Sequence, residues 1–117
     1  MKYGRVREMI SNSSRFDKEI RSIVDQLVQL YKPDKIILFG SLVRDRGEPR
    51  DIDLFIIKKD VPELGVDRIR ELDALIKYRL ATDFIVYKPE EVKERLKLGD
   101  PFIDNIFKEG KVLYDAQ

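Results

Sequence analysis

Hydrophobic residues recur at steps of three and four along two stretches of the chain, which predicts two amphipathic helices. The first helix begins near Ser14, where Asp17 follows three residues later as in a capping box, and it ends at Pro33. The second runs from Val66 through about Leu80. The positions expected to face the core are Phe16, Ile20, Ile23, Val24, Leu27 and Leu30 in the first helix, and Val66, Ile69, Leu72, Leu75 and Ile76 in the second.

Short apolar runs of strand length lie between and after these helices. Residues 35–39 (KIILF), 51–58 (DIDLFIIK) and 83–87 (DFIVY) predict three strands, and residues 112–114 a last edge strand. Pro89 with two following Glu predicts a third helix that Gly99 breaks, and residues 102–107 form a short fourth helix that ends at Gly110. The polar stretch 42–50 is expected to be a loop, with one helical turn as an option, while residues 1–12 show no clear period.

The order of these elements is helix, strand, strand, helix, strand, helix, helix, strand. Intermixed helices and strands predict an α/β (α+β) fold, in which about four helices pack on one small mixed sheet of three to four strands. The 117 residues suit a single domain, 1–117, and 43% hydrophobic residues are enough for a packed core. No repeat, linker or low-complexity segment divides the chain.

Composition removes several classes of function. The chain has no Cys and no His, which excludes disulfides, thiolate catalysis and the commonest metal ligand. A bound metal must therefore have oxygen ligands, which favours Mg²⁺ or Mn²⁺ over zinc. A net charge of +1 is not the basic footprint of a nucleic-acid binder, so nucleic acid is not expected as a direct ligand. No apolar run reaches membrane-spanning length and the N-terminus is too polar for a secretory signal, so we expect a cytoplasmic protein without a membrane partner.

Gly40 and Ser41 directly follow the first predicted strand. Glycine permits a tight turn and a close approach of the backbone to a bulky anion. If a helical turn follows, Ser41 stands at its start, where free N–H groups favour phosphate. The alternative is that the pair forms only a turn and a helix cap, because serine is a preferred cap residue.

Three aspartates form the second candidate feature. Asp51 and Asp53 stand at the start of a strand and share one face of it, because alternate strand residues point to the same side. Ile52, Leu54 and Ile56 point to the other side, into a core. A divalent cation would relieve the repulsion between the two carboxylates. Asp83 opens the third strand and joins them if the two strands are neighbours. The alternative is a set of solvated acids at strand ends.

LFGS (residues 38–41), nine residues and then DIDL (51–54) resemble the signature of the DNA polymerase beta-like nucleotidyltransferase superfamily, and most closely the minimal nucleotidyltransferases (MNT proteins). The resemblance covers about residues 36–87, and GKVLY (110–114) resembles the close of such domains. It implies a nucleotidyltransferase fold, with Gly40 and Ser41 on the triphosphate of ATP. It further implies that Asp51 and Asp53 bind Mg²⁺ and that Asp83, the third acid of this site, activates an acceptor hydroxyl.

The loop between the two motifs departs from the pattern of this superfamily. Many relatives carry G-S-x-x-R-G; here Arg44 is present as a candidate nucleotide-binding residue, but Asp45 replaces the last glycine. The loop is therefore expected to follow a different path. Arg44, Arg46 and Arg50 could contact phosphate or remain solvated loop charges.

The expected size of the domain leaves no residues for a separate acceptor-binding domain, so the acceptor is expected to come from elsewhere. MNT proteins are typically paired with a HEPN-domain protein, often as antitoxin and toxin, and can adenylylate a tyrosine of that partner. The resemblance thus implies AMP transfer to a HEPN toxin. Two alternatives stay open: a non-catalytic module that binds the HEPN partner, and a transferase for a small-molecule or nucleic-acid acceptor. Candidate apolar contacts with the partner are Phe102, Ile103, Ile106 and Phe107.

Overall fold

Five α-helices, one π-helical turn and four strands make up the part of the chain, residues 14–44 and 51–117, that the computed structural model describes. The segment 1–12 and most of the predicted loop 42–50 lie outside it. The elements are α1 (Ser14–Gln26), η1 (Leu27–Tyr31), β1 (Lys35–Phe39), α2 (Ser41–Arg44), β2 (Ile52–Ile57), α3 (Gly65–Leu75), β3 (Thr82–Tyr87), α4 (Pro89–Lys97), α5 (Pro101–Glu109) and β4 (Lys111–Asp115).

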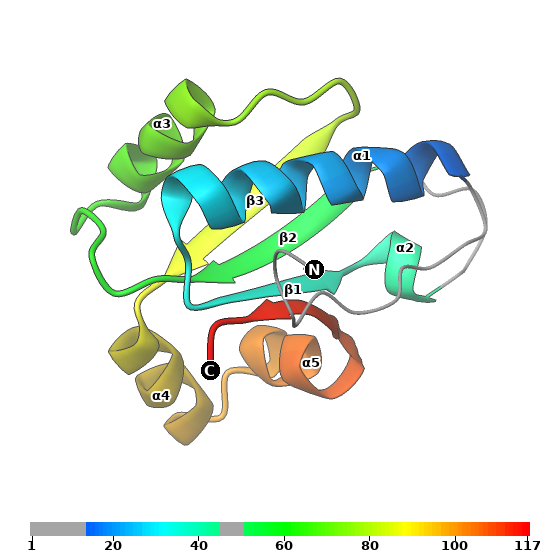
Figure 1. Ribbon diagram of the computed structural model, residues 1–117. Coiled ribbons are helices and arrows are strands. Elements are labelled where there is room, and N and C mark those ends of the chain that lie inside the picture. The colour runs from blue at the N-terminus through cyan, green and yellow to red at the C-terminus, as the bar shows by residue number, and fades with distance from the viewer. Residues whose placement is uncertain (1–13, 45–50) are drawn as a thin grey trace.

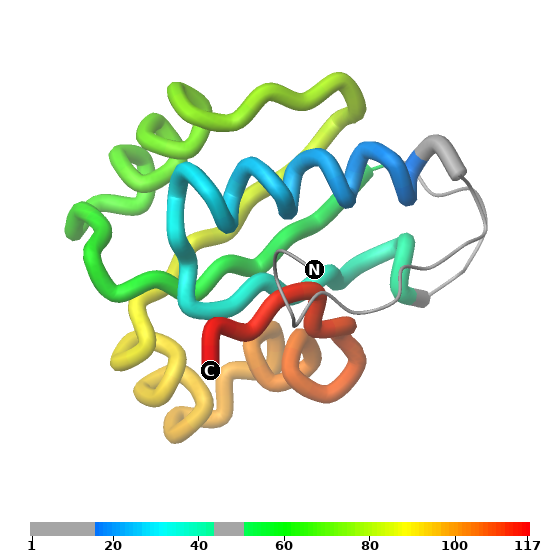
Figure 2. The backbone as a smooth tube through the Cα atoms, viewed as in Figure 1, coloured from blue at the N-terminus to red at the C-terminus, as the bar shows by residue number. Residues whose placement is uncertain are grey.

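The strands form one mixed sheet in the order β3-β2-β1-β4. Strand β1 is antiparallel to both β2 and β4, whereas β2 and β3 are parallel. Helices α1 and α3 cover one face of the sheet, and α4 and α5 cover the other (Figure 1). The chain path in Figure 2 brings the C-terminal strand back beside β1, at the edge of the sheet. The predicted α/β fold with a small mixed sheet is confirmed.

Two apolar clusters hold the helices to the sheet, one on each face. Alternate residues of β2 belong to different clusters, as the period of a strand requires. Ile52, Leu54 and Ile56 are fully buried beneath α1 and α3, while Phe55 and Ile57 face α4 and α5. The parity of the strand therefore places Asp53 on the α4/α5 face.

The first helix departs from the predicted pattern at its end. Five of the six residues expected in the core are buried, but Leu30 is 54% exposed and Tyr31 is buried in its place. The chain closes this helix with a π-helical turn, in which the Lys32 N–H bonds to the Leu27 carbonyl at 2.8 Å. Such a turn contains an extra residue compared with the α-helix, so the face that meets the sheet moves by one position.

Helix α3 ends at Leu75, five residues earlier than the periodicity predicts. Ile76 is extended and buried, and the backbone after it is fixed by side chains of α1. Gln26 bonds to both the N–H and the carbonyl of Lys77, and Glu19 accepts from the N–H groups of Arg79 and Leu80. These contacts replace the helical hydrogen bonds that residues 77–80 would otherwise make.

The core face of α3 also differs from its prediction. Leu72 and Ile76 are buried and Ile69 packs against the core, but Val66 and Leu75 are 56% and 40% exposed. The buried position in the first turns is Arg68, which is 4% exposed. The spacing of apolar residues therefore gives the wrong inward face for this helix, because the charged residue Arg68 occupies part of that face.

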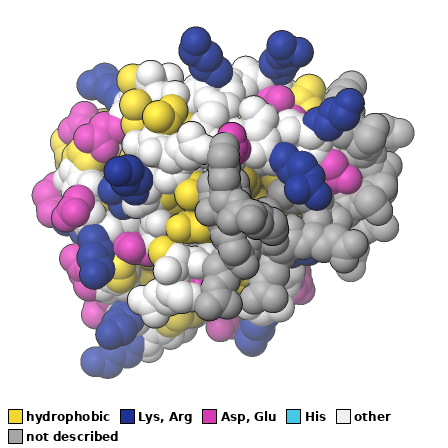
Figure 3. All heavy atoms as spheres, viewed as in Figure 1, with side chains coloured by type: hydrophobic (Ala, Val, Ile, Leu, Met, Phe, Trp, Pro, Cys, Tyr) yellow, Lys and Arg dark blue, Asp and Glu magenta, His cyan; other side chains and the backbone are white. Residues whose placement is uncertain are grey.

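Helices α4 and α5 begin at Pro89 and Pro101, close to the predicted boundaries. Asp100 caps α5 by accepting from the N–H of Phe102. No helix in the described ranges is both long and apolar enough to cross a bilayer. On the face shown in Figure 3, basic and acidic side chains are interspersed over the described part of the chain, in keeping with its near-zero net charge.

Candidate active site

Asp51, Asp53 and Asp83 lie at one end of the sheet, where β2 and β3 begin and β1 ends. Asp51 precedes the first residue of β2. Asp53 is the direct neighbour of Asp83 in the parallel register and of Phe39 in the antiparallel register. The condition for Asp83 to join the pair, that the two strands lie side by side, is therefore met.

Gly40 connects β1 to α2 beside these acids. Its φ of +83° belongs to the left-handed region that favours glycine. A Cβ atom at this position would stand 2.2 Å from the Oδ2 atom of Asp53. Ser41 is the first residue of α2, a helix of four residues. The glycine turn and the acid are thus in direct contact, and only a residue without a side chain allows it.

Burial and mutual repulsion govern the charge of Asp53. The pKa of its carboxyl is raised to about 6, mainly by burial and in addition by repulsion from the neighbouring carboxylates of Asp83 and Asp51. A hydrogen bond between the side chains of Asp53 and Asp83 contributes in the same direction. A bound cation would relieve the repulsion between these carboxylates.

The donor chemistry of this end of the sheet suits a hard divalent cation, because the candidate ligands are carboxylate oxygens. Their geometry is not that of a finished metal centre. Among the residues that the structure describes, no group of three or more acidic side chains is gathered closely enough to hold a metal ion. Loading with metal would therefore require the Asp53–Asp83 hydrogen bond to open.

The structure describes only the backbone of one of the three arginines that were expected near phosphate. Arg44 is the last residue of α2, three positions after Ser41, but its side chain is outside the described residues. Arg46 and Arg50 lie in the segment 45–50, which is also outside them. Their contact with phosphate stays a prediction.

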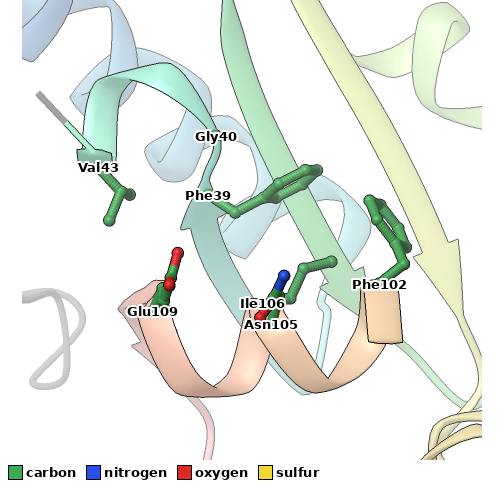
Figure 4. Close-up of a pocket in the computed structure, with 8 residues that line it drawn as sticks. Phe39, Gly40, Val43, Phe102, Asn105, Ile106 and Glu109 are labelled. Carbon is green, nitrogen blue, oxygen red and sulfur yellow. The ribbon is translucent and has the colours of Figure 1, made fainter. Parts of the chain in front are cut away.

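A pocket on the α5 side of Gly40 contains residues that the motifs do not include. Its walls come from the end of β1, from α2 and from α5, as Figure 4 shows. Phe39 and Phe102 meet edge to face there, with ring centroids 5.8 Å apart. The sequence places Phe39 directly before Gly40, but its position on the same sheet face as Asp53 follows from the register of β1 and β2. Phe102 was predicted only as a candidate apolar contact with a partner. Of the other residues in that prediction, Ile103 and Ile106 are buried in the core and Phe107 is partly exposed.

Asp53 and Asp83, on neighbouring parallel strands, lie beside a glycine turn at the end of a small mixed sheet. Comparison with known proteins identifies the family of this fold. Residues 18–117 match the family described as "Polymerase beta, Nucleotidyltransferase". The chain belongs to this family.

Two relatives resemble the chain over most of its length. A protein of Methanocaldococcus jannaschii named "putative protein adenylyltransferase" is 31% identical over 111 residues, which cover 85% of this chain and 74% of the relative. The crystal structure of "a putative nucleotidyltransferase" from Sulfolobus solfataricus superposes with a TM-score of 0.52 and 26% identity, covering 72% of this chain and 81% of that one. The identity of this chain as a nucleotidyltransferase thus rests on both sequence and fold.

The contact between Gly40 and Asp53 can be tested with a matched pair of alanine substitutions. Gly40 and Gly99 have similar positive φ angles, +83° and +78°, but a Cβ at Gly99 meets nothing within 4 Å. Both substitutions should cost about 1–2 kcal/mol of backbone strain. Only Gly40→Ala should displace the Asp53 carboxylate, and we expect it to lower transferase turnover by about 10²-fold. Equal turnover in the two variants, measured with labelled nucleotide, would show that this contact has no role in the reaction.

Proposed function

We propose that the protein transfers AMP from ATP to a hydroxyl group of another protein, and specifically to a tyrosine of a HEPN-domain partner whose toxicity it neutralises. The single observation that carries the transferase chemistry is the placement of Asp53 and Asp83 side by side against Gly40. The choice of AMP and of a protein acceptor is supported by the name of the Methanocaldococcus relative. The HEPN partner and the antitoxin role rest on the resemblance to MNT proteins.

Asp51 and Asp53 would hold Mg²⁺, with Asp83 as a further oxygen ligand. The ion would neutralise the triphosphate and stabilise charge at the reacting phosphorus. Gly40 and Ser41 place the phosphate chain against the acids. Asp83 accepts the proton of the tyrosine hydroxyl, whose oxygen forms a bond to the α-phosphorus. The bond from that phosphorus to the bridging oxygen breaks, and pyrophosphate leaves.

The raised pKa of Asp53 gives the proposal a pH dependence. Metal binding requires the ionised carboxylate, and without metal a pKa of about 6 keeps Asp53 protonated in mildly acidic solution. We therefore expect the affinity for Mg²⁺ to increase as pH rises through this value. Calorimetric titration of Mg²⁺ at pH 5 and pH 8 measures the change, and an affinity independent of pH would contradict the assignment of Asp53.

The experiment for the whole proposal uses the protein encoded by the neighbouring gene as the candidate acceptor. The two proteins are incubated with Mg²⁺ and ATP labelled at the α-phosphate, and the label is followed on the neighbour and located by mass spectrometry. We expect one labelled tyrosine and a loss of toxicity. A stable complex that never becomes labelled would support instead a non-catalytic binding module.

A further inference from the structure

Strand β3 forms one edge of the sheet, next to the candidate acids. The order β3-β2-β1-β4 leaves β2 as the only strand beside β3 within the described residues. Asp83 is the second residue of this edge strand, is exposed, and has Asp53 of β2 as its register neighbour. The outer side of β3 is therefore adjacent to the acid that accepts the hydroxyl proton in the proposed reaction.

The main-chain groups of β3 point alternately toward β2 and away from it, as in any strand. The carbonyls of Ala81 and Tyr87 accept hydrogen bonds from the main chain of β2 and of the residue that follows it, at 2.9 and 3.1 Å. The odd-numbered residues of β3 therefore bond to β2. The N–H and carbonyl groups of Thr82, Phe84 and Val86 consequently point outward, away from the sheet.

Only the half of this outer edge that lies beside the acids is open. The Arg68 guanidinium donates to the Val86 carbonyl at 3.0 Å, so a side chain of α3 closes the far half. No other group in ranges 14–44 and 51–117 hydrogen-bonds to the outward main chain of Thr82 or Phe84. A row of unpaired N–H and carbonyl groups on an edge strand is a template for another extended chain.

We propose that an extended segment of the acceptor protein binds as an added strand along residues 82–84 and thereby brings its hydroxyl group to Asp83. This inference rests on the proposed function, since it assigns how the acceptor of that reaction is bound. In an antiparallel pairing, a residue opposite Asp83 has its Cβ atom roughly 5 Å away, and diagonal neighbours lie at about 7–8 Å, within reach of an aromatic side chain. A tyrosine at a diagonal position can therefore bring its hydroxyl to the Asp83 carboxylate.

The two faces of β3 select different side chains in the added strand. Asp83 shares the α4/α5 face with Asp53, whereas Phe84 belongs to the apolar cluster beneath α1 and α3. Tyr78 packs edge to face against Phe84, with ring centroids 5.6 Å apart, and is 39% exposed, so it extends the apolar surface on that face. The segment is therefore expected to alternate, with an apolar residue on the Tyr78 face and the hydroxyl residue on the Asp83 face.

Hydrogen exchange of single amides, followed by NMR, tests the inference without a substitution. The complete chain is measured alone and together with the protein encoded by the neighbouring gene, in Mg²⁺ and a non-hydrolysable ATP analogue. We expect the amides of Thr82 and Phe84 to exchange rapidly in the chain alone and roughly tenfold more slowly, or slower still, with the acceptor. The Ile85 amide, which points to β2, is the control and should be protected in both samples.

Unchanged exchange of Thr82 and Phe84 in the presence of an acceptor that becomes labelled with ATP would overturn the inference. Protection of these amides in the chain alone would also overturn it, because a second copy or another part of this chain would then occupy the edge. Failure of the wild-type chain to label the neighbour would contradict the proposed function and this inference together. The labelling experiment therefore separates the two failures.

A pair of substitutions at Thr82 tests the same edge in the reaction. Thr82→Pro removes the outward N–H at the first residue of the strand, where proline is tolerated, and Thr82→Val retains it while removing the hydroxyl that bonds to the Leu80 carbonyl. We expect Thr82→Pro to raise the KM for the acceptor roughly tenfold relative to Thr82→Val, with equal calorimetric affinity for the ATP analogue. Equal acceptor KM in the two variants would contradict the added strand. If Thr82→Pro also weakens the analogue, the amide exchange of the wild-type chain decides.

Discussion

Asp53→Asn is expected to reduce nucleotidyl transfer by about 10³-fold and, in the same protein, to increase the free energy of unfolding above pH 6. The loss of activity follows because the amide cannot replace the ionised carboxylate as a metal ligand, and a metal ion contributes several kcal/mol to the reaction. The gain in stability follows because the charged form of Asp53 is penalised in the native state by burial and by the carboxylates of Asp83 and Asp51.

The sign of the pH dependence distinguishes this account from a general effect of substitution. The pKa of Asp53 rises from 3.8 to about 6 on folding, so the native state holds its proton more tightly than the unfolded chain. The cost of ionising Asp53 therefore appears as pH rises from about 4 and is complete above about 6. It amounts to at most about 3 kcal/mol there, and to less than that because solvent screens part of the repulsion. The asparagine variant avoids this cost, so its advantage over wild type should be absent near pH 4 and full at pH 8.

Urea unfolding without divalent cations, at pH 4 and pH 8, measures this difference. Asp60→Asn provides the control, because Asp60 is an exposed aspartate just beyond the opposite end of the same strand. We expect that control to retain both activity and wild-type stability. A stability difference between Asp53→Asn and wild type that is the same at both pH values would contradict the repulsion described for this site.

Arg68→Met is expected to lower the free energy of unfolding by about 2–4 kcal/mol, because it removes a buried guanidinium that pairs with the partly exposed Glu91 and leaves main-chain carbonyls without a donor. The Arg68 guanidinium makes two bonds to Glu91, at 2.7 and 3.0 Å, and its other N–H groups donate to main-chain carbonyls. These carbonyls belong to Pro62 and Glu63, before α3, and to Val86 in β3. One side chain thus joins α3, β3 and α4 at the end of the sheet opposite the acids.

Arg70→Met on the same helix is the matched control. The Arg70 side chain is 77% exposed and its ion pair with Asp67 spans 3.7 Å, so we expect a change of less than about 1 kcal/mol. Chemical denaturation at neutral pH compares the two variants. The hydrogen bond from Arg68 lowers the pKa of Glu91, so the contribution of this pair is present at neutral pH and decreases as pH falls through that lowered value. A loss in Arg68→Met no larger than in Arg70→Met would show that the network does not hold the helices.

The elements nearest the candidate site were the ones best predicted from the sequence. Strand β1 has the predicted bounds, β2 is one residue shorter than predicted at each end, and β3 begins one residue earlier than predicted. Local sequence preferences and tertiary packing agree in this region. Continuous apolar runs form the buried strands, and a glycine forms the turn between β1 and α2. The proximity of Asp83 to Asp53 was conditional on strand order, which a period of two along one strand cannot determine.

The remaining features depend on contacts between distant residues. The π-helical turn that exposes Leu30 and the early end of α3 both arise where tertiary contacts outweigh helical periodicity. Arg68 gives no sign of burial in the sequence, because its partners come from three separate elements. The pocket beside Gly40 requires α5 to fold back against the end of β1, and Phe102 acquires its position only through that packing.

The most direct measurement is a crystal structure with Mn²⁺ and a non-hydrolysable ATP analogue, in which the anomalous signal locates the metal. The account predicts a Mn²⁺ ion bound by carboxylate oxygens of Asp51 and Asp53, with the phosphates against Gly40 and the Asp53–Asp83 hydrogen bond broken. An ordered analogue with no metal at these aspartates, or with its phosphates away from Gly40, would contradict it.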